Sequence, residues 1–193
     1  TGYSAKAVAH SWEAQAGLPP ELDALLGGGT ELLVALPEHK VPLPGGGRAS
    51  QCDVFALVRR ADETIAVAVE GKVNEPFGPT VGEWLAAESE GRKRRLAFIA
   101  DLLEIDAAPA DLRYQLFHRT AAAVLEAKRF KTDRAAMIVQ SFSQDGRWFD
   151  DFARFASLLG LSTAIDTAAT KVLTGGLPLT IGWAKGHANF LLA

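Results

Sequence analysis

The sequence predicts an α/β domain in which helices pack on a mixed central sheet. Residues 52–59 and 64–72 are β-branched and apolar, and the three residues between them have the length of a hairpin turn. A further buried-strand pattern at 135–142 follows a stretch of helical periodicity. Helices that alternate with strands in this way indicate a sheet covered by helices.

The N-terminal part is predicted to contain two helices and one strand. Residues 4–15 form the first helix, which Gly17 and the Pro19-Pro20 pair close. Residues 21–26 form a short helix that ends at three consecutive glycines. The apolar run 31–36 then predicts a strand, and the turn-rich residues 37–47 predict a long exposed loop.

The chain after the hairpin is predicted to return to helices before its last strands. Residues 73–82 carry Pro76, Gly78 and Pro79, so a loop is expected there. Helical spacing of apolar residues follows the basic cluster 92–95, and a second helix is expected at 111–129. The strand at 135–142, a helix at 149–159 and a strand at 177–183 complete one domain, residues 1–193.

The composition indicates a cytoplasmic protein that does not enter a membrane. Cys52 is the only cysteine, which excludes a disulfide framework. Residues 1–10 lack the pattern of a signal peptide, and no apolar run is long enough to span a bilayer. The net charge of −3 excludes a broadly basic nucleic-acid binder, so phosphate contacts depend on local patches.

Charged residues gather where the second hairpin strand ends. Alternation along 64–72 places Glu70 and Lys72 on one face, with Ala66 and Ala68 behind them. Ile65, Val67 and Val69 face the other way. A simple hairpin pairing brings the start of the first strand, at Asp53, beside Glu70.

Two neighbouring carboxylates suggest a cation site. They repel each other unless they share a proton or a cation, and oxygen ligands suit Mg²⁺ or Mn²⁺. A lysine beside them can stabilise charge that develops during phosphodiester cleavage. The alternative is a strand-end salt bridge between Glu70 and Lys72, with Asp53 only starting a strand.

The same residues carry a resemblance to a known family. Asp53 opening one strand and Glu70-Gly71-Lys72 closing the next, within a helix, meander, helix, strand order, resemble the PD-(D/E)XK nuclease superfamily, which has the restriction-endonuclease-like fold. The wider segments 50–53 and 69–78 resemble an uncharacterised bacterial branch of it. Cys52 stands where the superfamily usually has proline.

The resemblance implies a metal-dependent nuclease that hydrolyses phosphodiester bonds, with DNA as the expected substrate. Asp53, Glu70 and Lys72 are then the catalytic residues, and Mg²⁺ or Mn²⁺ is held by Asp53, Glu70 and the Gly71 carbonyl. Glu13 on the first helix is the candidate for a further metal-binding acid, and Glu31 is a weaker one. The alternative is a non-catalytic protein of this fold that serves as a binding or accessory module.

A polar stripe on the helix at 111–129 provides the candidate substrate contacts. Gln115, His118 and Arg119 share one face at helical spacing. We expect Gln115 and Arg119 to face Glu70 and Lys72, because apolar residues occupy most of the remaining circumference. The alternative is a solvated polar face.

Two further expectations follow from the candidate site. A nuclease of this size needs a basic groove beside Glu70, or a homodimer that makes one. Cys52, which alternates with Asp53 in the predicted strand, is expected to point away from the carboxylates. A nucleophilic role for its thiol is therefore not expected.

Overall fold

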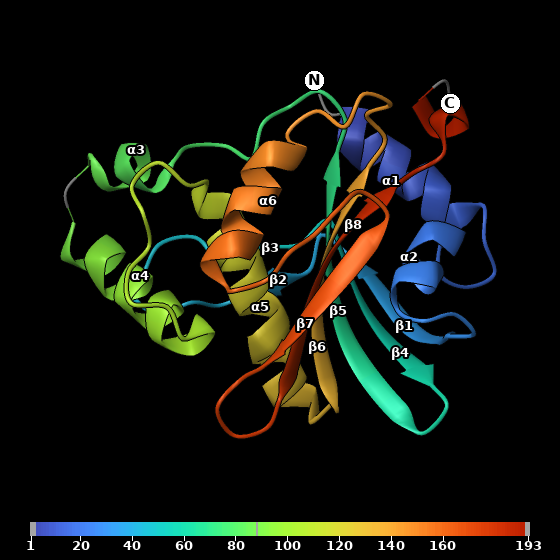
Figure 1. Cartoon of the computed structure of the whole chain (residues 1–193), viewed down its shortest axis with the longest axis horizontal. Helices are drawn as coiled ribbons and strands as arrows, with labels where there is room; N and C mark the ends of the chain where they lie inside the picture. Colours follow the sequence, from blue (N-terminus) through green and yellow to red (C-terminus); the bar gives the residue numbers. More distant parts are fainter. Residues whose placement is uncertain (1–2, 88, 192–193) are drawn as a thin grey trace.

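A computed structural model describes residues 3–87 and 89–191 and places a six-stranded mixed sheet at the centre of the molecule (Figure 1). The sheet order is β1-β4-β5-β6-β8-β7. Its strands are β1 (Glu31–Pro37), β4 (Val54–Arg60), β5 (Glu63–Lys72), β6 (Arg134–Ser141), β7 (Thr167–Val172) and β8 (Pro178–Lys185). A separate two-stranded ribbon consists of β2 (Lys40–Val41) and β3 (Ser50–Gln51).

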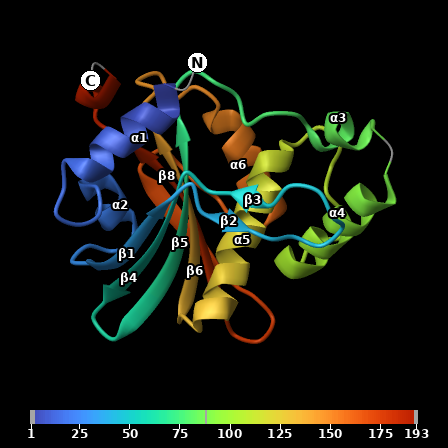
Figure 2. The same ribbon diagram turned by 180° about the vertical axis from the view of Figure 1, so that it is seen from behind.

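Helices flank the sheet on both faces. They are α1 (Tyr3–Glu13), α2 (Pro20–Leu25), α3 (Val81–Leu85), α4 (Glu90–Leu103), α5 (Tyr114–Phe130), α6 (Phe149–Leu158) and a 3₁₀ turn, η1 (Ala188–Leu191). Helices α1 and α2 cover one face, while α5 and α6 cover the other, with α3 and α4 beyond α5 (Figures 1 and 2). No helix in the described residues has the length and apolar character that a membrane crossing requires.

The strand pairing confirms the predicted mixed α/β architecture. Strands β1, β4 and β5 form an antiparallel meander, and β6 and β8 continue the sheet parallel to β5. The predicted alternation in β5 is also confirmed. Ile65, Val67 and Val69 belong to the core under α1 and α2, whereas Ala66 and Ala68 belong to the core under α5.

The path of α5 follows from the strand directions. Strand β6 is parallel to β5 and starts beside its beginning, at the Ile65–Arg134 pair. The intervening helix therefore runs back along the sheet, and its first turns lie over the end of β5. Small side chains on both elements, including Ala68 on β5 and Ala122 on α5, are fully or almost fully buried in this contact and allow a close approach.

Strands β2, β3 and β7, helix α3 and the turn η1 were not predicted from the sequence. The ribbon β2–β3 is two short pairs of residues, and helix α3 overlaps the end of the expected loop 73–82. Helix α3 begins with a capping box between Thr80 and Glu83. Strand β7 is rich in threonine and alanine and half-exposed, and it forms an edge by pairing with β8. The hydrophobic alternation of β7 is weak because the strand is held by pairing with β8 and not by burial of one face.

A glycine at the end of β5 allows α1 to approach the sheet. A methyl group built on Gly71 lies 2.4 Å from Val8 Cγ2 and 3.1 Å from Asp53 Oδ2. Val8 is buried in the core under α1. The absence of a side chain at position 71 therefore sets the distance between α1 and β5.

We expect Gly71→Ala to destabilise the protein by about 1–3 kcal/mol, because the added methyl group overpacks this contact. Chemical denaturation measures the loss. The control is the double variant with Val8→Ala, which removes the clashing methyl group, so its destabilisation should be smaller than the sum of the two single effects. Strict additivity of the two substitutions contradicts this packing.

Candidate functional site

The start of β4 lies beside the end of β5, which brings Asp53 next to the position of Glu70, as the simple hairpin pairing predicts. The ladder ends at the Val54–Val69 pair, and the Asp53 N–H donates to the Val69 carbonyl at 3.1 Å. Asp53 Oδ2 accepts a hydrogen bond from the Gly71 N–H at 2.6 Å. The Gly71 carbonyl lies beyond the last pair of this ladder.

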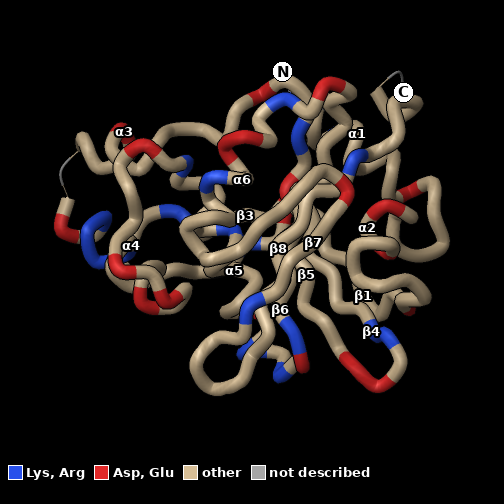
Figure 3. The backbone as a smooth tube through the Cα atoms, viewed as in Figure 1, with Lys and Arg blue, Asp and Glu red and all other residues tan. Residues whose placement is uncertain are grey.

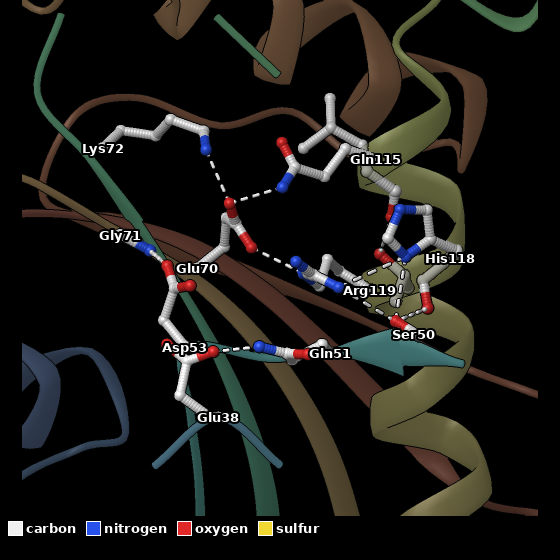
Figure 4. Close-up of polar contacts among 12 residues, drawn as sticks. Glu38, Ser50, Gln51, Asp53, Glu70, Gly71, Lys72, Gln115, His118 and Arg119 are labelled. Carbon is white, nitrogen blue, oxygen red and sulfur yellow. Dashed lines mark hydrogen bonds and ion pairs between the residues drawn. The ribbon is translucent and has the colours of Figure 1, made fainter. Parts of the chain in front are cut away.

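Glu70 is a buried carboxylate whose two oxygens are bound by protein donors. Its Oε1 accepts from Lys72 Nζ at 2.5 Å and from Gln115 Nε2 at 2.6 Å. Its Oε2 accepts from Arg119 Nε at 2.5 Å. Glu70 and Lys72 are each only 3% exposed. Figure 4 shows Glu70 extending from β5 toward these α5 side chains.

The prediction that Gln115 and Arg119 face the acidic centre is therefore confirmed. Both side chains come from the first turns of α5, which the chain path places over the end of β5. The Glu70–Lys72 salt bridge proposed as the alternative is also present, but as one contact in a larger network. A buried carboxylate needs such partners because isolated burial of a charge is costly.

His118 does not contact Glu70 directly but is linked to Arg119 through Ser50. Its Nδ1 is 2.8 Å from Ser50 Oγ, and Arg119 Nη1 donates to the same Oγ at 3.1 Å. Desolvation lowers the pKa of His118 well below its ordinary value, and the positive charge of Arg119 adds to this effect. His118 is therefore neutral near pH 7. Ser50 precedes Asp53 in the sequence, but no pattern assigned it a role.

The electrostatics of Asp53 are those of a carboxylate near a second one. Burial, and then the negative charge of Glu70, raise its pKa from 3.8 to about 7. Carboxylates that repel each other can share a proton or a cation, and their hard oxygens suit Mg²⁺ or Mn²⁺. The residues Asp53, Glu70 and Gly71 thus fit a divalent cation in donor chemistry.

The two additional acids considered from the sequence do not join this site. Glu13 is exposed in the last turn of α1, whereas Ser4 in the first turn and Val8 in the middle of the helix approach Gly71. Glu31 pairs with Arg59, at the opposite end of β4 from Asp53. Within residues 3–87 and 89–191 no three His, Cys, Asp or Glu side chains gather as a metal-binding group.

The expected orientation of Cys52 is wrong. Cys52 precedes the first residue of β4 and lies in the core beneath α5, with Ala66 and Ala68. Strand alternation does not apply to it because it is outside the strand. Burial raises the pKa of its thiol to about 12, so the thiol is not a nucleophile near neutral pH.

Glu75 is a carboxylate that the sequence patterns did not single out. Its Oε2 accepts from the Val73 and Asn74 N–H groups at 3.3 and 3.1 Å. Its Oε1 is buried and has no hydrogen-bond partner among the described residues. Glu75 lines a cavity of about 350 Å³ together with Lys72, Gln115 and Arg119. Only the fold shows that it faces the site.

Three cavities meet at His118, and their walls are basic. Besides the cavity beside Lys72, one is lined by the ribbon β2–β3 and Arg119, and one by α4 and loop 43–50. Figure 3 shows basic segments near α4 and beside β3. Among the described lining residues the only acid is Glu75, against six cations: Lys40, Arg48, Lys72, Arg92, Arg95 and Arg119. Lys72 and Arg119 are paired with Glu70, so the excess positive charge of this basic groove comes from the other four cations.

We expect the raised pKa of Asp53 to make the metal-free protein less stable as pH rises. The folded state holds this proton more tightly than the unfolded chain. The resulting loss of folding stability is therefore absent below about pH 4 and complete above about pH 7. Asp53→Asn should remove roughly 2–4 kcal/mol of this decline. Denaturation in chelator at several pH values measures it, and parallel pH profiles for both proteins contradict it.

Comparison with known proteins places the chain in one family. A search of curated proteins and a search of solved structures gave no match. Residues 1–188 match a family described as a domain of unknown function, DUF6946. The match spans the sheet, the flanking helices and every residue of the site described above. The chain therefore belongs to the DUF6946 family.

Proposed function

We propose that the protein is a metal-dependent nuclease that hydrolyses phosphodiester bonds, with DNA as its substrate. The observation that carries this proposal is the meeting of Asp53 with Glu70, Gly71 and Lys72 at adjoining strand ends. The raised pKa of Asp53 supports it, because a divalent cation would offset both the burial of this carboxylate and its repulsion by Glu70.

The order of the core elements supports the finer fold assignment that accompanies this proposal. Helix α1, the meander β1-β4-β5, helix α5 and the parallel strand β6 follow one another in space. The same helix, meander, helix, strand order accompanies the motif that resembles the PD-(D/E)XK superfamily. We therefore propose a restriction-endonuclease-like core, with β8 and β7 added at the edge beyond β6.

In the proposed site, Asp53, Glu70 and the Gly71 carbonyl hold Mg²⁺ or Mn²⁺. When bound, such an ion activates water and stabilises negative charge on the phosphate. Lys72 adds a positive charge at the same place, where it neutralises charge that develops on the phosphate oxygens. Gln115 shares Glu70 Oε1 with Lys72, so it can keep Glu70 oriented when Lys72 turns to a substrate.

The cationic cavities support a nucleic-acid substrate. Lys40, Arg48 and Arg119 line one cavity without a carboxylate among its described residues. Local positive charge attracts the phosphate backbone even when the whole protein is acidic. The proposed partner is DNA, bound by one copy or across a homodimer, in a cytoplasm where Cys52 stays reduced.

The complete pairing of Glu70 favours a second candidate function. Lys72, Gln115 and Arg119 satisfy both of its oxygens, so the centre is stable without any cation. A cation must compete with these donors for Glu70. A protein of this fold that uses the basic groove for binding alone, as an accessory module, needs no such exchange.

We expect the purified protein to cleave DNA only with Mg²⁺ or Mn²⁺. Asp53→Asn and Lys72→Met should each slow cleavage by about 100-fold or more, because the first removes a charged metal ligand and the second removes the positive charge beside the phosphate. Methionine keeps most of the buried lysine stem, and a thermal melt checks that each variant folds. Gel assays on single-stranded, linear and supercoiled DNA measure the rates.

The matched control for this experiment is Glu13→Gln, which changes an acid that lies outside the site. It should cleave like the unaltered protein. Cleavage that persists in excess chelator contradicts the mechanism. Binding without cleavage of any DNA or RNA under these conditions supports the accessory-module function.

We expect Lys40→Gln to weaken DNA binding without unfolding the protein, because Lys40 is exposed at the wall of a basic cavity. The slope of log affinity against log salt should become shallower by about one. Fluorescence polarisation with a catalytically blocked protein measures both quantities. Lys6→Gln, on the opposite side of the sheet, is the charge-matched control, and an equal effect of the two substitutions excludes this groove.

A further inference from the structure

Of the three cavities that His118 lines, the one between α4 and loop 43–50 is built by elements outside the strand meander. It encloses about 420 Å³ between loop 43–50, the α3–α4 region and the start of α5. Among its described lining residues there are three arginines, Arg48, Arg92 and Arg95, and no carboxylate. An uncompensated cluster of this kind attracts anions.

Arg95 is a structural residue of this cavity. It is 7% exposed, and its guanidinium donates to the carbonyls of Leu43, Pro44, Gly46 and Arg48. These contacts fasten loop 43–50 to α4. Because Arg95 is saturated in this way, Arg48 and Arg92 are the arginines with donors left for a ligand.

Arg92 is held at the cavity wall without losing that capacity. One of its terminal nitrogens donates to the Trp84 carbonyl, and its guanidinium lies 5.4 Å from the centroid of the Trp84 ring. The other N–H groups of the Arg92 guanidinium make no hydrogen bond to the described residues. A planar fork with free N–H groups suits a phosphate oxygen pair.

Tyr114 supplies an unsatisfied donor at the same place. The residue is 6% exposed, and its hydroxyl has no hydrogen-bond partner among the described residues. Burial raises the pKa of this hydroxyl, and the close approach of the Arg95 guanidinium, together with its charge, opposes part of the rise, although no hydrogen bond of ordinary geometry joins the two groups. An unpaired buried hydroxyl is costly, so a ligand that accepts its hydrogen bond is favoured.

Two features of the cavity wall favour an end group over a stacked base. The ring of Trp84 has Tyr114 stacked on it at 3.8 Å and Arg92 over it at 5.4 Å, so its faces are occupied. Loop 43–50 also closes onto α4 where Gly45 and Gly91 are in backbone contact, which leaves no room for a Cβ on either residue. A closed wall there suits a terminal group better than a continuous strand.

We propose that this cavity binds the terminal phosphomonoester of a nucleic-acid strand, through Arg48, Arg92 and the Tyr114 hydroxyl. The proposal rests on the proposed nuclease function for its choice of ligand. Tyr114 and His118 line both this cavity and the one beside Lys72, so an end phosphate held here places the adjoining strand at the candidate site. The protein then acts near strand ends.

The test measures binding in chelator, so that it does not depend on cleavage. Calorimetry compares a short single strand with a terminal phosphate, the same strand with hydroxyl ends, and inorganic phosphate. We expect the phosphorylated strand to bind about tenfold more tightly than the hydroxyl strand. Tyr114→Phe should remove most of this difference while the melting temperature stays equal or rises, because the lost hydroxyl has no protein partner.

Arg92→Gln should also abolish the preference for the phosphorylated strand. The matched control is Arg94→Gln, which removes the same charge from an exposed position of α4 outside the cavity. Equal affinity for both strands, or an unchanged preference in Tyr114→Phe, overturns the proposal. Inorganic phosphate that binds as tightly as the phosphorylated strand reassigns the cavity to the free ion. A failure of DNA cleavage alone leaves these binding results unaffected.

Discussion

The buried charge of Glu70 is the constraint on which the arrangement of the site depends. Its carboxylate is held between Lys72 on its own strand and Arg119 on α5, both of which are themselves almost inaccessible to water. Removing one partner from such a network leaves an uncompensated charge, which costs about 3–5 kcal/mol. Strand β5 and helix α5 are therefore coupled electrostatically as well as by packing, and Arg119 extends the coupling to Ser50 on β3.

Small residues make this electrostatic coupling possible. Alanines on β5 and α5 bring the helix close enough for Gln115 and Arg119 to reach the strand end. On the other face, Gly71 lets α1 approach and leaves its N–H to Asp53. Asp53 and Glu70 thus both lie at the end of β5 between the two helical layers, and burial, followed by the charge of Glu70, raises the pKa of Asp53.

The walls around this centre come from a different part of the chain. The segment between β5 and α5 carries α3 and α4, and loop 43–50 folds against α4 through Arg95. Together they surround the first turns of α5 with cationic side chains. The sheet therefore supplies the acidic centre, and the insertions supply the surface that would hold a phosphorylated ligand.

Local periodicity determined the core elements, the hairpin register and the faces of β5, because alternation and turn length depend only on residues that are close in sequence. It also identified Asp53, Glu70, Lys72 and the α5 stripe. Contacts between distant segments decided the rest. The end of α1 that carries Glu13 lies away from the site. Cys52 lies in the core because it precedes the strand and does not follow its alternation. The surroundings of Glu75, Ser50 and Tyr114 form only when loops fold against α5. No periodic pattern records such contacts, since burial and pairing across the chain create them.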